Sequence, residues 1–159
     1  MFNLKQPQGI TQVSPAKERE NMKKLSDILT RNDKESFYYP GITYSELLDG
    51  FEYEIVVQVD DKDYQGDSRL LFKDGDRFGY LNFGWGSCSG CDALEGCSSF
   101  EEVEKLYQDL YESIRWFDNA KECLDFFEKH DWEGDYSWYA DEQKQFINEC
   151  KEKLKARLF

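Results

Sequence analysis

The sequence has 159 residues, of which 40% are hydrophobic and 16% aromatic, so the chain can bury a core without disulfides. Its formal net charge is −13, and this charge is uneven: residues 1–35 carry +2 and residues 36–159 carry −15. Such an anionic body excludes direct binding to bare DNA or RNA and favours a basic partner, although charge of this kind also simply keeps proteins soluble.

The amino-terminal sequence and the cysteine content favour a reducing cellular compartment for this protein. Residues 1–10 contain no apolar run of the kind found in a signal peptide, and no stretch approaches the length of a membrane span. Five cysteines without a leader favour metal ligands or free thiols in a reducing environment over a disulfide framework. We expect a cytoplasmic monomer with a mobile arm over residues 1–13 and a single domain over residues 14–159.

The first half of the chain predicts one helix and a small sheet. Ser14-Pro15 is a helix start, and the helix is expected to continue to about Arg31. Alternating apolar residues then predict three strands, with a charged turn after the first and an Asp-Gly turn after the second. The strands are expected at residues 51–59, 69–72 and 78–83, as an antiparallel meander.

The second half predicts three helices that cover the meander. An N-cap at Ser98 or Ser99, with Glu101 and Glu102 behind it, starts a helix whose apolar stripe extends to Phe117. Further helices are expected at residues 120–130 and 141–158. The expected fold class is therefore α+β: a three-stranded antiparallel sheet packed against about four helices.

A cysteine-rich stretch separates the two halves. Residues 84–97 contain Cys88, Cys91 and Cys97 in a C-x2-C-x5-C arrangement, with glycines that permit tight turns. Two thiolates at C-x2-C spacing can bind one tetrahedral zinc ion, and Cys97 is close enough in sequence to bind the same ion. We predict a zinc knuckle at the junction between sheet and helices, with a structural Zn²⁺.

The fourth zinc ligand is not defined by the spacing. His130 is the only histidine and is the preferred fourth ligand, with Cys123 and carboxylates such as Asp92 as competitors. An ordinary histidine at a helix end is the alternative for His130. The alternatives for the whole stretch are three reduced cysteines in a glycine-rich loop, or a redox or disulfide role.

No catalytic constellation is evident. The H-x-E or C-x-E followed by P-C-x-x-C of zinc deaminases does not occur, and a single histidine leaves no general base for a cysteine nucleophile. Cys123 and Cys150 lie on the apolar stripes of predicted helices and are expected to be core residues. We therefore predict no catalytic residues and no enzymatic activity.

Two kinds of surface feature have open interpretations. Runs of acidic residues are either solvated faces or a mimic of the nucleic-acid backbone that occupies a basic groove. Aromatic residues of the segment after the helix expected at residues 120–130 are either a binding loop or a lid over the core. These aromatic residues are Trp132, Tyr136, Trp138 and Tyr139.

Three segments carry a resemblance to a known group of proteins. They are Gly79-Tyr80-Leu81 running into G-S-C-S-G-C-D-A-L at residues 86–94, S-I-R-W-F-D from Ser113, and H-D-W-E-G-D-Y-S-W from His130. From Phe78 to its end, the chain resembles a group of small acidic phage and prophage proteins. It is also similar to zinc-containing anti-CRISPR inhibitors of type II-A Cas9.

The resemblance implies a function and a partner. It implies a phage-encoded, non-enzymatic protein that binds Cas9, alone or with guide RNA, and blocks loading or cleavage of target DNA. It implies Cys88, Cys91 and Cys97 as metal ligands, whereas the role of His130 is our own inference from the residues. The alternatives are a small hydrolase-like phage metalloenzyme and a protein-binding module unrelated to CRISPR.

Overall fold

The computed structural model describes residues 22–29, 42–87, 90, 92–134 and 140–158, and these form two compact units. The first unit contains the described residues of 53–84 and 114–158, and the second contains the other described residues. The arm predicted at residues 1–13 lies outside the described residues, and the single domain stays a prediction.

The first unit is built on a four-stranded antiparallel sheet in the order β1-β2-β3-β4. Its strands are β1 (Glu54–Asp60), β2 (Gly66–Asp74), β3 (Arg77–Trp85) and β4 (Arg115–Phe117). Gly75 occupies the turn between β2 and β3 with a φ of 60°, a backbone angle that suits glycine. The predicted meander is confirmed, and its first strand begins at Glu54 rather than at Phe51.

The fourth strand corrects the sequence prediction. Residues 115–117 were expected to continue a helix, but they pair with β3 in the register Phe78↔Phe117 and Tyr80↔Arg115. The preceding helix ends at its C-cap Ser113, whose hydroxyl donates to the carbonyl oxygen of Asp109 at 2.6 Å. The β-branched and aromatic residues that follow Ser113 favour an extended backbone. Their apolar character alone is compatible with either a helix or a strand.

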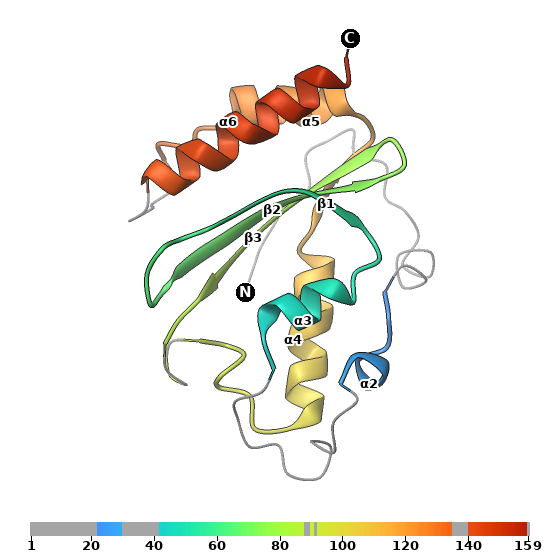
Figure 1. Cartoon of the computed structure of the whole chain (residues 1–159), viewed down its shortest axis with the longest axis vertical. Coiled ribbons are helices and arrows are strands. Elements are labelled where there is room, and N and C mark those ends of the chain that lie inside the picture. Colours follow the sequence, from blue (N-terminus) through green and yellow to red (C-terminus); the bar gives the residue numbers. More distant parts are fainter. Residues whose placement is uncertain (1–21, 30–41, 88–89, 91, 135–139, 159) are drawn as a thin grey trace. The chain divides into compact units, whose positions relative to one another are not determined.

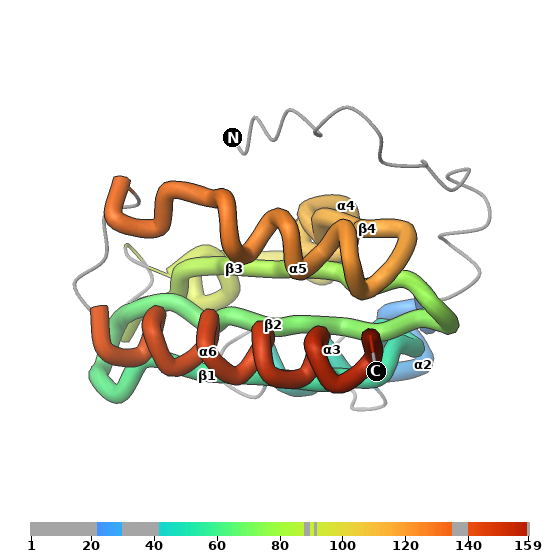
Figure 2. The backbone as a smooth tube through the Cα atoms, turned by 90° about the horizontal axis from the view of Figure 1, so that it is seen from above, coloured from blue at the N-terminus to red at the C-terminus, as the bar shows by residue number. Residues whose placement is uncertain are grey.

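Two helices cover one face of this sheet (Figures 1 and 2). α5 (Ala120–Lys129) starts at the N-cap Asn119, whose side chain accepts a hydrogen bond from the Glu122 amide at 2.9 Å. α6 (Ala140–Ala156) packs beside α5 and over β1 and β2. The buried apolar cluster between helices and sheet is formed by Val57, Val59, Leu71, Phe78, Phe117, Ala120, Cys123, Leu124, Phe127, Phe146, Ile147, Cys150 and Leu154.

The second unit contains three helices: α2 (Leu25–Ile28), α3 (Tyr44–Asp49) and α4 (Phe100–Glu112). Phe51, which follows α3, packs against α4, because its ring stacks on Tyr107 at 5.4 Å and meets Tyr111 edge-on at 5.2 Å. The Tyr107 hydroxyl donates to the Lys23 carbonyl oxygen at 2.7 Å. A small aromatic core therefore holds the segment before α2 against α4.

The helices of the second unit also correct the prediction. A continuous helix over residues 14–31 is wrong at residues 22–24, because Met22 forms a β-bridge with Phe51 and Lys24 is extended before α2. Helix α3 was missed, although Thr43 and Glu46 have the spacing of an N-cap, and the Thr43 hydroxyl accepts from the Glu46 amide. Five helices are described instead of about four. Within the described ranges, no helix is long and apolar enough to cross a membrane.

Candidate functional site

The predicted zinc ligands are distributed over described and undescribed parts of the chain. Cys88 and Cys91 lie outside the described residues, whereas Cys97 belongs to the second unit and His130 to the first. Among the residues that the structure describes, no group of three or more His, Cys, Asp or Glu side chains could hold a metal ion. The zinc site therefore stays a prediction.

Asp92, the residue after Cys91, organises this part of the second unit. Its side chain is 6% exposed, and one oxygen, Oδ1, accepts hydrogen bonds from the Tyr44 hydroxyl at 2.9 Å and the Leu94 amide at 2.8 Å. The same oxygen lies 3.2 Å from the Glu95 amide nitrogen. The other oxygen, Oδ2, accepts from the Gly86 amide at 2.8 Å. All four of these donors are neutral groups.

These contacts close a loop, which we call the cysteine loop and define as residues 86–97. The bond from Gly86 to Asp92 joins the residues on either side of the C-x2-C motif. The bonds to Leu94 and Glu95 form an Asx turn, and the Gly96 amide adds a bond to the Asp92 carbonyl oxygen at 2.9 Å. One carboxylate thus fixes both the entry to the cysteine loop and the turn that leads to Cys97.

Tyr44 connects the cysteine loop to α3. Its hydroxyl donates to Asp92 and accepts from the Leu94 amide at 3.3 Å. Burial raises the pKa of Tyr44 well above its ordinary value, and the negative charge of Asp92 raises it further. Tyr44 is therefore a neutral hydrogen-bond donor under all ordinary conditions.

Cys97 lies buried at the end of the same turn. Its Sγ donates to the Ala93 carbonyl oxygen at 3.2 Å, so the sulfur carries its proton in this arrangement. Burial raises the pKa of the Cys97 thiol, and the carboxylates of Glu102 and Asp92 raise it further. As described, Cys97 is a thiol and not a preformed nucleophile.

His130 lies in an aromatic cluster at the end of α5. Its ring is 4.5 Å from the Trp132 ring, edge-on, and 5.0 Å from the Phe126 ring. Trp132 stacks on the buried Phe127 and donates from Nε1 to the Phe127 carbonyl oxygen at 2.9 Å. For Trp132 these contacts favour the lid interpretation over the binding loop. The other aromatic residues of that segment, Tyr136, Trp138 and Tyr139, lie outside the described residues.

The remaining two cysteines are core residues, as predicted. Cys123 on α5 and Cys150 on α6 are fully buried in the apolar cluster of the first unit. Burial raises the pKa of both thiols far above the ordinary value. Cys123 and Asp92 are the competitors of His130 for the fourth zinc ligand. Cys123 lies in the first unit, as His130 does. Asp92 lies in the second unit, where its carboxylate already accepts four hydrogen bonds.

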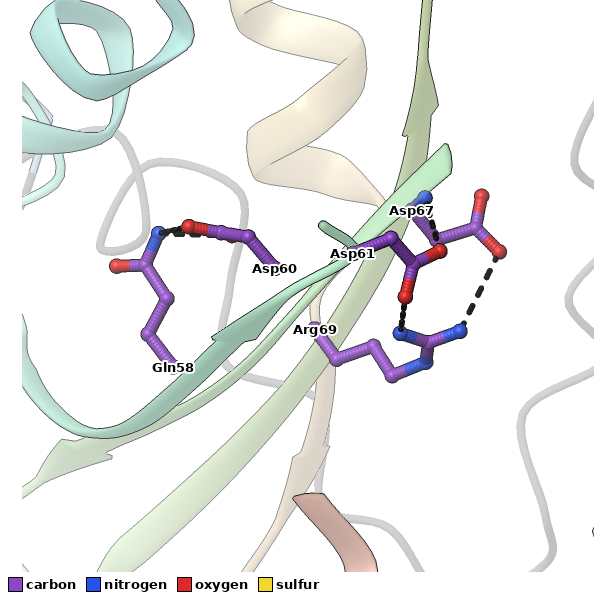
Figure 3. Close-up of polar contacts among 5 residues, drawn as sticks. All are labelled: Gln58, Asp60, Asp61, Asp67 and Arg69. Atoms are coloured by element: carbon purple, nitrogen blue, oxygen red, sulfur yellow. Dashed lines mark hydrogen bonds and ion pairs between the residues drawn. The ribbon is translucent and has the colours of Figure 1, made fainter. Parts of the chain in front are cut away.

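The first unit has its own buried carboxylate, which the sequence analysis missed. Figure 3 shows Arg69 of β2 between Asp61 and Asp67, the residues at the two ends of the turn from β1 to β2. Arg69 and Asp61 are both 1% exposed at their side chains, and Arg69 Nη1 lies 2.7 Å from Asp61 Oδ1. Asp61 Oδ2 also accepts from the Asp67 amide at 2.7 Å. The only sequence signal for this contact is an arginine within an otherwise apolar strand.

Acidic side chains concentrate in the second unit. Its described residues contain eleven carboxylates and three basic residues, Lys23, Lys24 and Lys105. The outward side of α4 exposes Glu101, Glu104 and Glu112, while Glu102 is also exposed and its carboxylate accepts from the Ser98 amide. Lys105 lies 3.8 Å from Asp109, a surface pair that compensates little of this charge. The surface of α4 is thus an anionic face.

The described residues therefore combine a carboxylate-anchored cysteine loop with an anionic helix. The three described cysteines are buried thiols, so none of them is an exposed, activated nucleophile. Searches against protein-family models, curated proteins and solved structures found no match for this chain.

Proposed function

We propose that this chain is a non-enzymatic anti-CRISPR protein that binds Cas9 and blocks loading or cleavage of target DNA. The observation that carries the proposal is the anionic face of α4, together with the eleven carboxylates against three basic residues among the described residues of the second unit. The anti-CRISPR identity and Cas9 as the partner come from the sequence resemblance. The chain would be phage-encoded and would act in the bacterial cytoplasm.

The charge pattern supports a basic macromolecular partner. Exposed carboxylates on a helix repel nucleic acid, and they accelerate encounter with a basic protein surface, such as a groove that normally holds DNA. Glu101, Glu104 and Glu112 are exposed, and the buried side of α4 is held by Val103, Tyr107 and Leu110. The helix can therefore present these charges without rearranging its core.

A structural Zn²⁺ is part of the proposal. It would be held by Cys88, Cys91 and Cys97, with His130 as the proposed fourth ligand, and it would stabilise the cysteine loop beside α4. Zinc bound to thiolates contributes its binding energy to folding, so the metal would act on inhibition indirectly, through stability. Replacement of Cys88 and Cys91 by serine should lower the melting temperature and reduce inhibition together.

The test is a Cas9 cleavage assay with purified protein added before guide loading, after guide loading or after target binding. Several type II-A Cas9 orthologues should be compared. We expect inhibition when the protein is added before target DNA, and a loss of inhibition when DNA is bound first. No inhibition at any stage with any orthologue would overturn the Cas9 assignment, and partner capture would then test for a different protein-binding role.

A matched pair of variants tests the anionic face. The triple variant Glu101→Gln, Glu104→Gln and Glu112→Gln should associate with Cas9 roughly tenfold more slowly and with a weaker dependence on salt. Its control removes the same number of exposed carboxylates from the first unit, by changing Glu54, Glu133 and Glu152 to glutamine. Equal effects of the two triple variants would mean that net charge, and not the face of α4, governs association.

A further inference from the structure

We propose that the turn from β1 to β2 is a preorganised docking loop, and that Tyr64 at its tip is the anchor that enters an apolar, basic-rimmed pocket on the partner protein. We define residues 61–67 as the tyrosine turn. The inference rests on the proposed function, for which the partner is Cas9, and it adds a second contact surface to the anionic face of α4. All the contacts that support it belong to described residues of the first unit.

The first step is the exposure of Tyr64. This residue is 83% exposed, whereas Ile55 and Leu158, the other exposed large apolar residues of the described chain, are 39% and 45% exposed. The Tyr64 amide donates to Asp63 Oδ1 at 2.8 Å, so the backbone at the tip is held while the side chain stays accessible. Tyrosine combines a rigid apolar ring with a hydroxyl, and it is among the residues that most often dominate the binding energy of protein interfaces.

The second step is the construction beneath the tip. The Asp61 amide donates to the Asp67 carbonyl oxygen at 3.0 Å, and the Asp67 amide donates back to Asp61 Oδ2 at 2.7 Å. The other oxygen of Asp61 meets the buried guanidinium of Arg69 at 2.7 Å (Figure 3). Gly66 packs so closely that a Cβ atom there would lie 2.5 Å from the Cβ of Asp61. These contacts favour a single conformation of the tyrosine turn.

The third step is the energetic cost of this construction. Two antiparallel strands can be joined by a tight turn alone, as β2 and β3 are at Gly75. A buried ion pair loses the hydration of both charges, and an apolar pair of similar volume is often equally stable. We therefore assign the pair of Asp61 and Arg69 to the shape of the turn. A loop that already holds its bound conformation loses less entropy on association and binds more tightly.

The fourth step is the chemistry of the partner. Asp60 and Asp63 are exposed beside the tip, and Lys62 is the single basic residue between them. The Gln58 side-chain amide donates to Asp60 Oδ1 at 3.2 Å, so this carboxylate is also held in place (Figure 3). A ring with carboxylates beside it fits an apolar pocket whose rim carries lysine or arginine. Channels for single-stranded nucleic acid have this character, because they combine basic side chains with platforms on which bases stack.

The experiment measures association and dissociation rates of the full chain on immobilised Cas9 with guide RNA. We expect Tyr64→Ala to raise the dissociation rate roughly 10–100-fold, because the variant lacks the ring that anchors the contact. Its association rate should stay within about twofold of the wild type, since changes at an interface act mostly on dissociation. Tyr64→Phe keeps the ring and should raise the dissociation rate by a smaller factor. The glutamine variants of α4, in contrast, are expected to slow association.

A second variant tests the preorganisation of the turn. Asp61→Leu, Arg69→Met removes the ion pair and keeps Tyr64, and urea unfolding shows whether the variant is folded. We expect the folded double variant to dissociate faster than the wild type and more slowly than Tyr64→Ala. Wild-type dissociation in the folded double variant would overturn the role of the ion pair in docking.

The matched control is Leu158→Ala, which removes another exposed apolar side chain of the first unit and should leave both rates at the wild-type values. Wild-type dissociation in Tyr64→Ala, or an equal increase in Leu158→Ala, overturns the docking role of Tyr64 and leaves the binding of Cas9 intact. Absence of wild-type binding to every Cas9 orthologue overturns the proposed function, and this inference with it.

Discussion

Among the residues that the structure describes, each of the two units buries one aspartate at a loop, and the two aspartates are satisfied in different ways. In the first unit Asp61 meets the guanidinium of Arg69 at 2.7 Å, so a full positive charge compensates it. In the second unit Asp92 accepts bonds from a hydroxyl and three backbone amides. The first arrangement holds a strand end to its neighbour, and the second shapes an irregular loop.

The two kinds of partner predict different effects when each aspartate is removed. Removing one member of a buried ion pair leaves the other charge without compensation in a medium of low dielectric constant. Removing an acceptor from neutral donors leaves backbone amides unsatisfied, which costs less for each group but affects several chain segments. Removal of Asp61 should therefore lower the global stability of the first unit, whereas removal of Asp92 should reduce local order in the second unit.

The largest effect should come from breaking the ion pair. Asp61→Asn is expected to lower the free energy of unfolding by about 3–5 kcal/mol, because Arg69 stays buried and charged and keeps only the more distant carboxylate of Asp67, 3.8 Å away. Urea unfolding followed by circular dichroism measures the change. The double variant Asp61→Leu, Arg69→Met should recover much of the loss, and a double variant as unstable as Asp61→Asn would contradict this explanation.

The Asp92→Asn substitution should have a smaller and more local effect. We expect a loss of about 1–3 kcal/mol, because asparagine keeps one oxygen and places its NH₂ group against either the Gly86 amide or the Tyr44 and Leu94 donors, while no charge is left unpaired. Amide hydrogen exchange should locate faster opening in the cysteine loop and leave the sheet of the first unit at wild-type protection. Uniform loss of protection in both units would show that the two anchors are not independent.

The buried thiols predict a dependence on pH above neutrality. The pKa of the thiols of Cys123 and Cys150 is raised in the folded state, so above the unfolded thiol pKa of about 8.5 the native state binds more protons than the unfolded chain. Stability contributed by these thiols is complete below that pH and is lost as the pH rises. Between pH 8 and pH 10 the loss should be about 1–2 kcal/mol for each thiol.

Urea unfolding at pH 8 and pH 10 measures this dependence. The matched control is the double variant Cys123→Ala, Cys150→Ala, which lacks both buried thiols of the first unit. Its unfolding free energy should decline less between the two pH values than that of the wild type. Parallel declines in the two proteins would assign the pH dependence to other groups.

The smallest effect should follow from removing a helix cap. Asn119→Ala deletes the acceptor of the Glu122 amide and is expected to cost about 1 kcal/mol, which thermal unfolding can resolve. Ser99→Ala, at the equivalent position of α4, is the matched variant in the second unit. Because each cap serves one helix, the two losses should add in the double variant.

Much of the first unit could be predicted from sequence because its elements have clear periodicity and local end signals. The Asp-Gly turn between β2 and β3, the Asn119 cap and the apolar stripes of α5 and α6 each depend on neighbouring residues. Strand β4 was missed because an apolar run after a helix suits either structure, and only pairing with Phe78 and Tyr80 decides.

The candidate site was less predictable because its organisation is not local. The cysteine spacing predicts a zinc site, which stays a prediction, and the D-A-L sequence at residues 92–94 is compatible with the Asx turn that Asp92 forms. The contact of Asp92 with Tyr44, however, spans 48 positions and has no counterpart in any sequence pattern. Arg69 likewise finds Asp61 only once β1 and β2 are paired. Tertiary partners of buried polar groups follow from the fold and not from the motif.

The position of β4 has a consequence for the order in which the chain folds. Short turns join β1, β2 and β3, whereas residues 86–114, with the cysteine loop and α4, separate β3 from β4. Contacts between distant residues form later, because closing the intervening chain costs entropy before the contact stabilises it. During synthesis β3 therefore leaves the ribosome with its outer edge unpaired. The sheet is completed only after α4 has been made, so that stage is when the nascent chain is most exposed to pairing with another strand.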